Sequence, residues 1–141
     1  MDTSQTWWDF AADMKHSPSL RVLIVDDEAL IRWSLANTLR DCGHEAVEAI
    51  SGAAAVRAVA DARLPFDVLL LDFRLPDSSD LRLLAELRRL TPTTSVVLMT
   101  AYGTPEVVQG ALDLGAFRVV GKPLDMSDLP ALVQQAYAAG H

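Results

Sequence analysis

Polar side chains that could share one reaction stand directly after short apolar runs of this 141-residue sequence. Asp26 and Asp27 follow one run, and Asp72 follows a run of valine and leucine. Carboxylates packed side by side repel each other, and the pKa of at least one rises unless a cation shares them. Mg²⁺ is the natural cation, because it takes oxygen ligands and needs only one or two carboxylates and a carbonyl beside its waters. The aspartates therefore predict a magnesium site if the fold brings them together.

Two more residues extend this chemistry. Lys122 offers a positive charge suited to a phosphoryl oxygen that the metal does not reach, and the Thr100 hydroxyl can donate to another. Metal, lysine and hydroxyl together are complementary to a phosphoryl group about to be attached to a carboxylate. The residue types thus favour phosphoryl chemistry on an aspartate.

The elements that must position these residues alternate along the chain from residue 21 onward. Strands are expected at residues 21–25, 45–49, 68–71, 95–99 and 117–120, and helices at about 31–42, 52–63, 80–90, 104–114 and 127–138. Ser51 and Thr104 are placed before helices, Gly43 and Gly115 after them. This alternation predicts a doubly wound α/β fold of the flavodoxin-like (βα)5 type, a three-layer sandwich around a five-stranded parallel sheet. Ligands of such sheets bind beyond the carboxyl ends of the strands, which is where the polar residues fall.

Helical spacing also predicts buried faces. Cys42 continues the apolar row of Ile31, Leu35 and Leu39 and is expected in the core, and Trp33 is expected to be partly buried. A second row is expected to point inward: Leu83, Leu84, Leu87 and Leu90. His16, His44 and His141 lack metal-ligand spacing and are assigned no role.

Composition fits one soluble globular domain and limits its partners. Half of the residues are hydrophobic, and 12 basic against 19 acidic residues give a net charge of −7. Without a basic stripe, direct nucleic-acid binding is not expected. The longest apolar run, at residues 68–71, is too short for a bilayer, so no membrane association is expected. A lone cysteine, Cys42, and the absence of a signal-peptide pattern favour the cytoplasm.

Residues 1–20 are expected to form a leader separate from the domain at residues 21–141. Trp7, Phe10 (or Ala11) and Met14 fall at helical spacing, which indicates a short amphipathic helix. The favoured interpretation is a helix packed on the domain or a frayed segment. An aromatic anchor for a partner protein is the alternative.

Taken in their order along the chain, the motifs of this sequence resemble the CheY-like receiver domain of two-component response regulators. The matching sequences, within residues 21–138, are Val25-Asp26-Asp27-Glu28, Leu71-Asp72 followed by Leu75-Pro76, Met99-Thr100-Ala101-Tyr102-Gly103, Leu114-Gly115-Ala116-Phe117 and Gly121-Lys122-Pro123-Leu124. The stretch from Thr100 to Glu106 looks most like receivers of the NtrC type, which precede AAA+ activators of σ54-dependent transcription. Five motifs in order on an α/β pattern make the resemblance specific.

The resemblance implies a role for each acidic residue. Asp72 would be the phosphoacceptor, taking a phosphoryl group from a sensor histidine kinase or a histidine phosphotransfer protein. Asp27 and Asp72 would ligate Mg²⁺ directly, Asp26 would hold it partly through water, and the Arg74 carbonyl would be a further ligand.

It also implies how the signal is read. Thr100 would be the switch hydroxyl, Lys122 would pair with the phosphate, and the Ala101 N–H would donate to it. The protein would be a two-state switch that promotes its own phosphoryl transfer and loss, not a conventional enzyme. The face formed by the helix at 104–114, the last strand and the last helix would change, and the family uses this face for homodimers and partner proteins.

Three departures from the family pattern concern the output and the loop. Val119 stands where an aromatic switch residue is usual, and Asp80 stands where a glycine commonly follows the phosphoacceptor loop. The 45-residue step from Asp27 to Asp72 is a little longer than usual, which predicts extra residues near 61–66.

Other function classes stay open beside this one. A phosphorylation-independent, receiver-like adaptor is the main alternative, for which Val119 and Asp80 leave room. An aspartyl-phosphate hydrolase of the haloacid dehalogenase type would need a second aspartate two residues after the first, where Arg74 stands. A nucleotide-binding domain is disfavoured, because acidic residues and not a glycine-rich loop follow the first strand.

Overall fold

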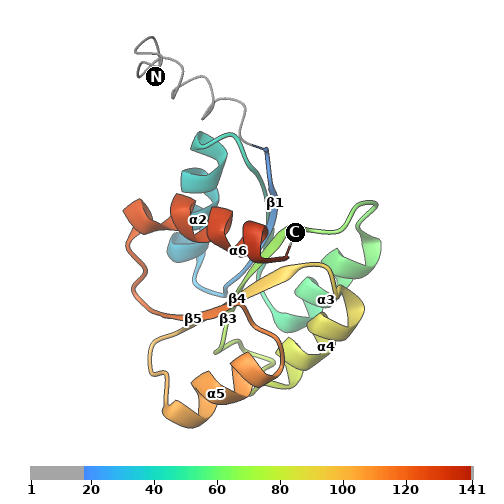
Figure 1. Ribbon diagram of the computed structural model, residues 1–141, viewed down its shortest axis with the longest axis vertical. Helices are drawn as coiled ribbons and strands as arrows, with labels where there is room; N and C mark the ends of the chain where they lie inside the picture. Colours follow the sequence, from blue (N-terminus) through green and yellow to red (C-terminus); the bar gives the residue numbers. More distant parts are fainter. Residues whose placement is uncertain (1–17, 141) are drawn as a thin grey trace, which may run out of the picture.

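A computed structural model describes residues 18–140, and within them one sheet of five parallel strands lies between two layers of helices (Figure 1). The strands are β1 Arg21–Val25, β2 Glu45–Ala49, β3 Val68–Asp72, β4 Ser95–Thr100 and β5 Arg118–Gly121. The helices are α2 Ala29–Asp41, α3 Gly52–Asp61, α4 Arg82–Leu90, α5 Pro105–Asp113 and α6 Leu129–Gly140, with a 3₁₀ turn, η1 Met126–Asp128, before α6. The strand order is β2-β1-β3-β4-β5. The predicted doubly wound fold is confirmed.

The core has two layers because alternate residues of each strand face opposite sides of the sheet. Leu35 and Leu39 of α2 and Val133 of α6 pack on one face, against residues such as Ile24 and Leu70. Helices α3, α4 and α5 cover the other face. After their first residues, strands β1, β3 and β4 are therefore apolar until they end, and polar side chains return at the carboxyl edge.

The predicted helix ends are confirmed at their glycines and caps. Gly43 after α2 and Gly115 after α5 have φ of +86° and +96°, a left-handed conformation that glycine adopts without strain. Ser51 and Thr104 cap α3 and α5, where each hydroxyl accepts a hydrogen bond from a backbone N–H three residues on. These caps fix where each helix starts after its strand.

Three burial predictions were wrong, and each lies near a helix end or off its apolar row. Cys42 is exposed because it is the C-cap of α2, where the chain turns into Gly43. Trp33 is 60% exposed, since Leu35 and Leu39 set the buried face of α2 on the other side. Leu90, the last residue of α4, is 40% exposed, whereas Leu83, Leu84 and Leu87 are buried as predicted.

The first described residues attach to the sheet. Leu20 is buried in the core, and its N–H donates to His44 Nδ1. The expected helix around Trp7, Phe10 and Met14 lies outside the described residues. Between residues 18 and 140, no helix is long and apolar enough to cross a membrane.

Candidate functional site at the carboxyl edge of the sheet

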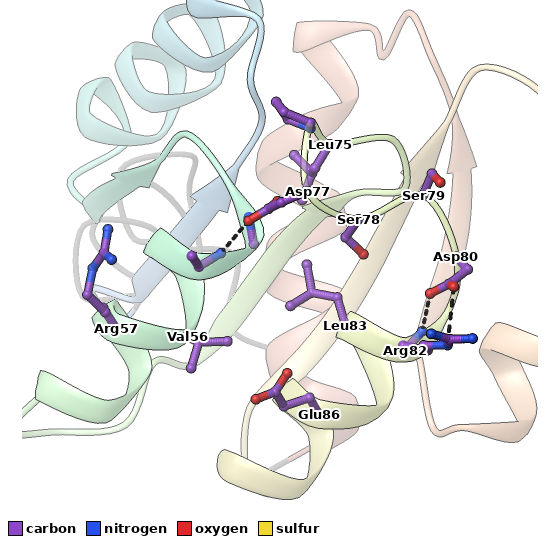
Figure 2. Close-up of a pocket in the computed structure, with 13 residues that line it drawn as sticks. Val56, Arg57, Leu75, Asp77, Ser78, Ser79, Asp80, Arg82, Leu83 and Glu86 are labelled. Atoms are coloured by element: carbon purple, nitrogen blue, oxygen red, sulfur yellow. Dashed lines mark hydrogen bonds and ion pairs between the residues drawn. The ribbon is translucent and has the colours of Figure 1, made fainter.

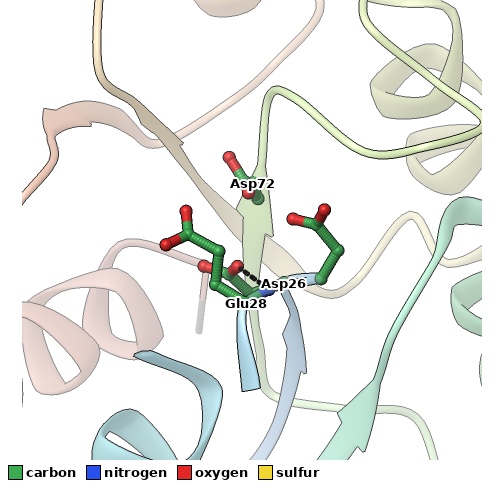
Figure 3. A group of neighbouring side chains, drawn as sticks. Asp26, Glu28 and Asp72 are labelled. Carbon is green, nitrogen blue, oxygen red and sulfur yellow. Dashed lines mark hydrogen bonds between the residues drawn. The ribbon is translucent and has the colours of Figure 1, made fainter. Parts of the chain in front are cut away.

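Acidic side chains from two neighbouring strands meet at the carboxyl edge of the sheet. Among the described residues, one carboxylate oxygen each from Asp26, Asp27, Glu28 and Asp72 lies within 4.8 Å of the others. Figure 3 shows Asp26, Glu28 and Asp72 grouped around the ends of β1 and β3. The parallel register that aligns Val25 with Leu71 places these residues side by side. The predicted convergence of the aspartates is therefore present.

Lys122 supplies the positive charge among these carboxylates. Its Nζ donates to Asp26 Oδ2 at 3.0 Å, to Asp72 Oδ2 at 3.2 Å and to Glu28 Oε1 at 3.3 Å. An ammonium group has three N–H donors, so all of them are used. Lys122 reaches the site from the end of β5, where its backbone N–H bonds to the Thr100 carbonyl and its peptide bond to Pro123 is cis.

The three carboxylates bonded to Lys122 differ in how deeply they are buried. The Asp26 side chain is fully buried, that of Asp72 is 5% exposed, and that of Glu28 is 60% exposed. Burial raises the pKa of Asp72, and the charge of Asp26 raises it further, against the Arg74 N–H and Lys122, which lower it. Burial opposes the charge of Lys122, but the bond to Asp26 and the charges of Asp26 and Asp72 outweigh it, so the pKa of Lys122 is raised. Lys122 therefore stays protonated, and its positive charge only partly compensates the effects that raise the pKa of Asp72.

The other predicted site residues line one cavity of about 470 Å³ with these groups. Its walls include Asp27, Asp72, Arg74, Thr100, Ala101 and Lys122. Thr100, at the end of β4, is 5% exposed, and its hydroxyl accepts from the Tyr102 N–H at 3.3 Å. The structure therefore brings all the predicted site residues together, with Asp26 buried beneath the cavity.

Local backbone geometry orients the two buried aspartates. Asp26 Oδ1 accepts from the Glu28 N–H at 2.9 Å, and Asp72 Oδ1 accepts from the Arg74 N–H at 3.2 Å. In each case the second oxygen, Oδ2, faces Lys122. Both carboxylates are held at one oxygen by the turn that follows their strand.

Glu28 is the site residue that sequence reasoning left without a role. It stands directly after Asp26-Asp27 and is the N-cap residue of α2, although its side chain makes no capping bond. Instead it reaches Lys122, 94 residues further along the chain. Its position as the third acidic residue after the first strand was the sequence feature that could have identified it as a site residue.

The donor set suits a hard divalent cation. Mg²⁺ takes oxygen ligands and usually keeps several waters, so a few carboxylates at an open cavity satisfy it. Four carboxylates with one ammonium leave an excess of negative charge, which a divalent cation would reduce. The residues present therefore fit magnesium.

Asp80 and Val119, the two departures from the family pattern that lie near the site, fit into regular local structure. Asp80 accepts from the Arg82 N–H at 2.9 Å, which forms a turn before α4. Val119 pairs with Leu98 of β4 and is half-buried against the core on the α3, α4 and α5 side. The first replaces a glycine by a residue that stabilises the start of a helix, and the second puts a small side chain where a ring is usual.

A second, larger cavity of about 760 Å³ lies beside the loop that follows β3 (Figure 2). Its walls come from that loop, from α3 and from α4, and include Leu75, Asp77, Leu83 and Arg57. Asp77 belongs to this loop and faces the start of α3, where its carboxylate accepts from the Gly52 and Ala53 N–H groups (Figure 2). The loop behind Asp72 is therefore connected to a neighbouring helix.

Fold and site together define a receiver: a five-stranded doubly wound sheet with an acidic cluster and a lysine at its carboxyl edge. A family model described as the response regulator receiver domain matches residues 22–134. The chain belongs to this family, the receiver domains of two-component response regulators.

Comparison with known proteins agrees with this family. The chain is 40% identical over 116 residues to the regulatory protein AtoC of Escherichia coli, an alignment that covers 82% of this chain and 25% of AtoC. It thus spans about a quarter of that relative. A CheY-like receiver from Methanospirillum hungatei superimposes with a TM-score of 0.81 at 26% identity, covering 87% of this chain and 97% of the other. The beryllofluoride-activated NtrC4 receiver domain dimer superimposes with a TM-score of 0.78 at 25% identity, covering 86% and 98%.

Proposed function

We propose that this receiver is a phosphorylation-activated switch in which Asp72 accepts a phosphoryl group in a magnesium-dependent reaction. The observation that carries the proposal is the position of Asp72: nearly buried, beside two further aspartates, and bonded to Lys122. A sensor histidine kinase or a histidine phosphotransfer protein is the donor that this family uses.

The transfer forms one bond and breaks one. A carboxylate oxygen of Asp72 attacks the phosphorus of a phosphohistidine, an O–P bond forms, and the P–N bond breaks as the departing imidazole nitrogen takes a proton from solvent water. Asp26, Asp27, Asp72 and the Arg74 carbonyl would hold Mg²⁺. When bound, the metal neutralises charge on the transferred group. The chain's own contribution is to fix the attacking oxygen and to present Lys122, Thr100 and the Ala101 N–H to the phosphoryl oxygens.

Lys122 must exchange a partner when the phosphoryl group arrives. Its three donors bind Asp26, Glu28 and Asp72, so none is free for a phosphoryl oxygen. Asp26 is fully buried and cannot withdraw, whereas Glu28 is exposed and makes the longest of the three bonds. Release of Glu28 is therefore the easiest way to free a donor.

The signal would leave through α5, β5 and α6. Thr100 and Ala101 begin the loop that leads to α5, so their movement toward the phosphoryl group displaces that helix. This face has exposed Leu112 and Leu114, and a cavity of about 340 Å³ between β5 and α6. A related receiver is named as a beryllofluoride-activated dimer, which supports formation of a homodimer, and we place its contact on this face.

The decisive experiment compares the wild type with Asp72→Asn in the presence of Mg²⁺ and either acetyl phosphate or beryllofluoride. The wild type should gain about 80 Da as an acid-labile phosphoryl group, the mass of HPO₃ added by the transfer. Beryllofluoride should shift the amide resonances of Thr100 and Ala101. Asp72→Asn should show neither change.

If the wild type shows no label and no shift while remaining folded, the switch is wrong. The receiver-like adaptor, which binds partners regardless of phosphorylation, then becomes the better account. A partner affinity that is equal in the free and beryllofluoride-bound states would lead to the same conclusion.

A further inference from the structure

The loop between Asp72 and α4 carries part of the proposed site but makes few bonds to the rest of the protein. Near its start, the Phe73 N–H bonds to the Met99 carbonyl of β4. Further along, Leu75 and Ser78 bond only to each other, and Asp80 bonds to Arg82 at the start of α4. Over residues 75–80 of the described chain, the hydrogen bonds that reach an element other than the adjoining α4 are the two made by Asp77.

Asp77 binds the N-terminus of α3 with both carboxylate oxygens. Oδ1 accepts from the Gly52 N–H at 2.8 Å and Oδ2 from the Ala53 N–H at 2.9 Å. The next N–H, of Ala54, is bonded to the Ser51 hydroxyl at 3.1 Å. One end of α3 is thus capped twice, once by its own Ser51 and once by a residue of the phosphoacceptor loop.

The close approach of Asp77 favours a glycine at the start of α3. A Cβ on Gly52 would lie 3.1 Å from Asp77 Oδ1 and 3.0 Å from Leu83 Cδ2, both closer than ordinary contact. The two hydrogen bonds also hold the pKa of Asp77 below its usual value. The carboxylate therefore stays charged at neutral pH, where bonds to backbone N–H groups are strongest.

We infer that Asp77 is a positioning residue for the phosphoacceptor site. It anchors the loop on α3 so that the Arg74 carbonyl and the turn around Asp72 keep the geometry that the cation and the phosphoryl group need. This inference rests on the proposed function of Asp72. The role inferred for Asp77 is distinct from that of Asp72, because Asp77 lines the neighbouring cavity and not the phosphoacceptor cavity.

Ser51 provides a matched control for this role. Asp77→Ala and Ser51→Ala each remove a cap from the same helix end, so both should lower stability by similar amounts. Only Asp77→Ala also frees the loop. Asp77→Asn keeps one carbonyl oxygen as an acceptor for a single N–H, and it serves if the alanine variant does not fold.

The experiment titrates Mg²⁺, and then beryllofluoride at saturating Mg²⁺, into wild type, Asp77→Ala, Asp77→Asn and Ser51→Ala, each followed by the amide resonances of residues 72–75. Loss of an outer contact that orients ligands typically lowers metal affinity by about tenfold or more, and we expect this for Asp77→Ala. Asp77→Asn should be intermediate, and Ser51→Ala should match the wild type within about twofold.

Equal affinities in Asp77→Ala and Ser51→Ala would show that Asp77 is only a helix cap and overturn the inference. Failure of the wild type itself to bind beryllofluoride would instead remove the proposed function. The two failures are therefore distinguishable in one set of titrations.

Discussion

The two ends of the sheet differ in how their polar groups are paired with hydrogen-bond and ion-pair partners. At the amino edge, two buried acceptors each meet a donor, since His44 Nδ1 accepts from the Leu20 N–H and the Phe66 carbonyl from the Thr94 hydroxyl. Half-buried Asp67 likewise accepts from the Arg21 N–H. At the carboxyl edge, four carboxylates lie together, and three of them share one lysine.

This difference separates stability from function. A buried polar group with a matched partner costs little, whereas an excess of like charge is unfavourable until a ligand compensates it. The acceptors named at the amino edge are satisfied by the protein alone, although Arg88 Nε, whose guanidinium donates from Nη1 to the Thr94 carbonyl, is buried without a partner among the described residues. The carboxyl edge carries an excess of negative charge, as expected of a site that binds a cation.

The largest effect should come from removing the lysine. Lys122→Met leaves Asp26 fully buried with no cationic partner, and breaking a buried ion pair from one side costs about 3 kcal/mol. Urea unfolding in EDTA measures this loss, with Glu86→Gln, an exposed charge change in the other cavity, as the control. A loss under about 1 kcal/mol would mean that the acidic edge does not need its lysine and would break the comparison.

At the amino edge, Thr94→Val should cost about 2 kcal/mol while leaving the site unaffected. Thr94 is 1% exposed, and its hydroxyl bonds the Phe66 carbonyl at 2.7 Å and the Thr91 hydroxyl at 2.5 Å. The isosteric valine leaves both partners unsatisfied. Beryllofluoride affinity should match that of the wild type; a clear drop would show that the two edges are coupled.

Asp72→Asn should stabilise the metal-free protein by about 1 kcal/mol at pH 7, because it removes a charge from the crowded edge. The folded-state pKa of Asp72 is raised, so the wild type loses stability as the pH rises from the unfolded pKa of 3.8 through the folded one. Asp72→Asn should lack that loss. Mg²⁺ should raise the melting temperature of the wild type more than that of the variant. A variant less stable than the wild type in EDTA would contradict this.

The smallest effect concerns His44. Burial lowers its pKa, partly opposed by Asp67, and Nδ1 must stay unprotonated to accept from Leu20. The stability that His44 provides is therefore complete above its unfolded pKa of 6.5 and is lost as the pH falls through the folded value. Denaturation at pH 8 and pH 5 should show the advantage of the wild type over His44→Asn shrinking at pH 5. An advantage that is constant with pH would show that His44 does not titrate on unfolding.

The sequence was sufficient for the fold and for most of the site because both depend on strand ends. Where an apolar run stops at Asp26 or Asp72, the register of a parallel sheet places the two together, and only the order of strands is needed. The caps at Ser51 and Thr104 are similarly local.

What could not be predicted depends on contacts between distant elements. Asp77 reads as an ordinary turn residue, and its bonds to Gly52 and Ala53 exist only once α3 lies beside the loop. Glu28 turns away from its own helix to a lysine on another strand. Trp33 shows a further limit, since helical spacing alone does not fix which side of a helix meets the sheet when both carry apolar residues.

The bond between Lys122 and Asp26 spans 96 residues, which bears on the order in which the chain folds. Contacts between residues so far apart form late, because long loops must close first. The first three strands bring Asp26 and Asp72 together while Lys122, the lysine that neutralises them among the described residues, still lies on an unattached segment. Folding intermediates should therefore be sensitive to divalent cations, which can compensate the acidic edge before β5 docks. In a stopped-flow experiment, Mg²⁺ should accelerate refolding as well as slow unfolding.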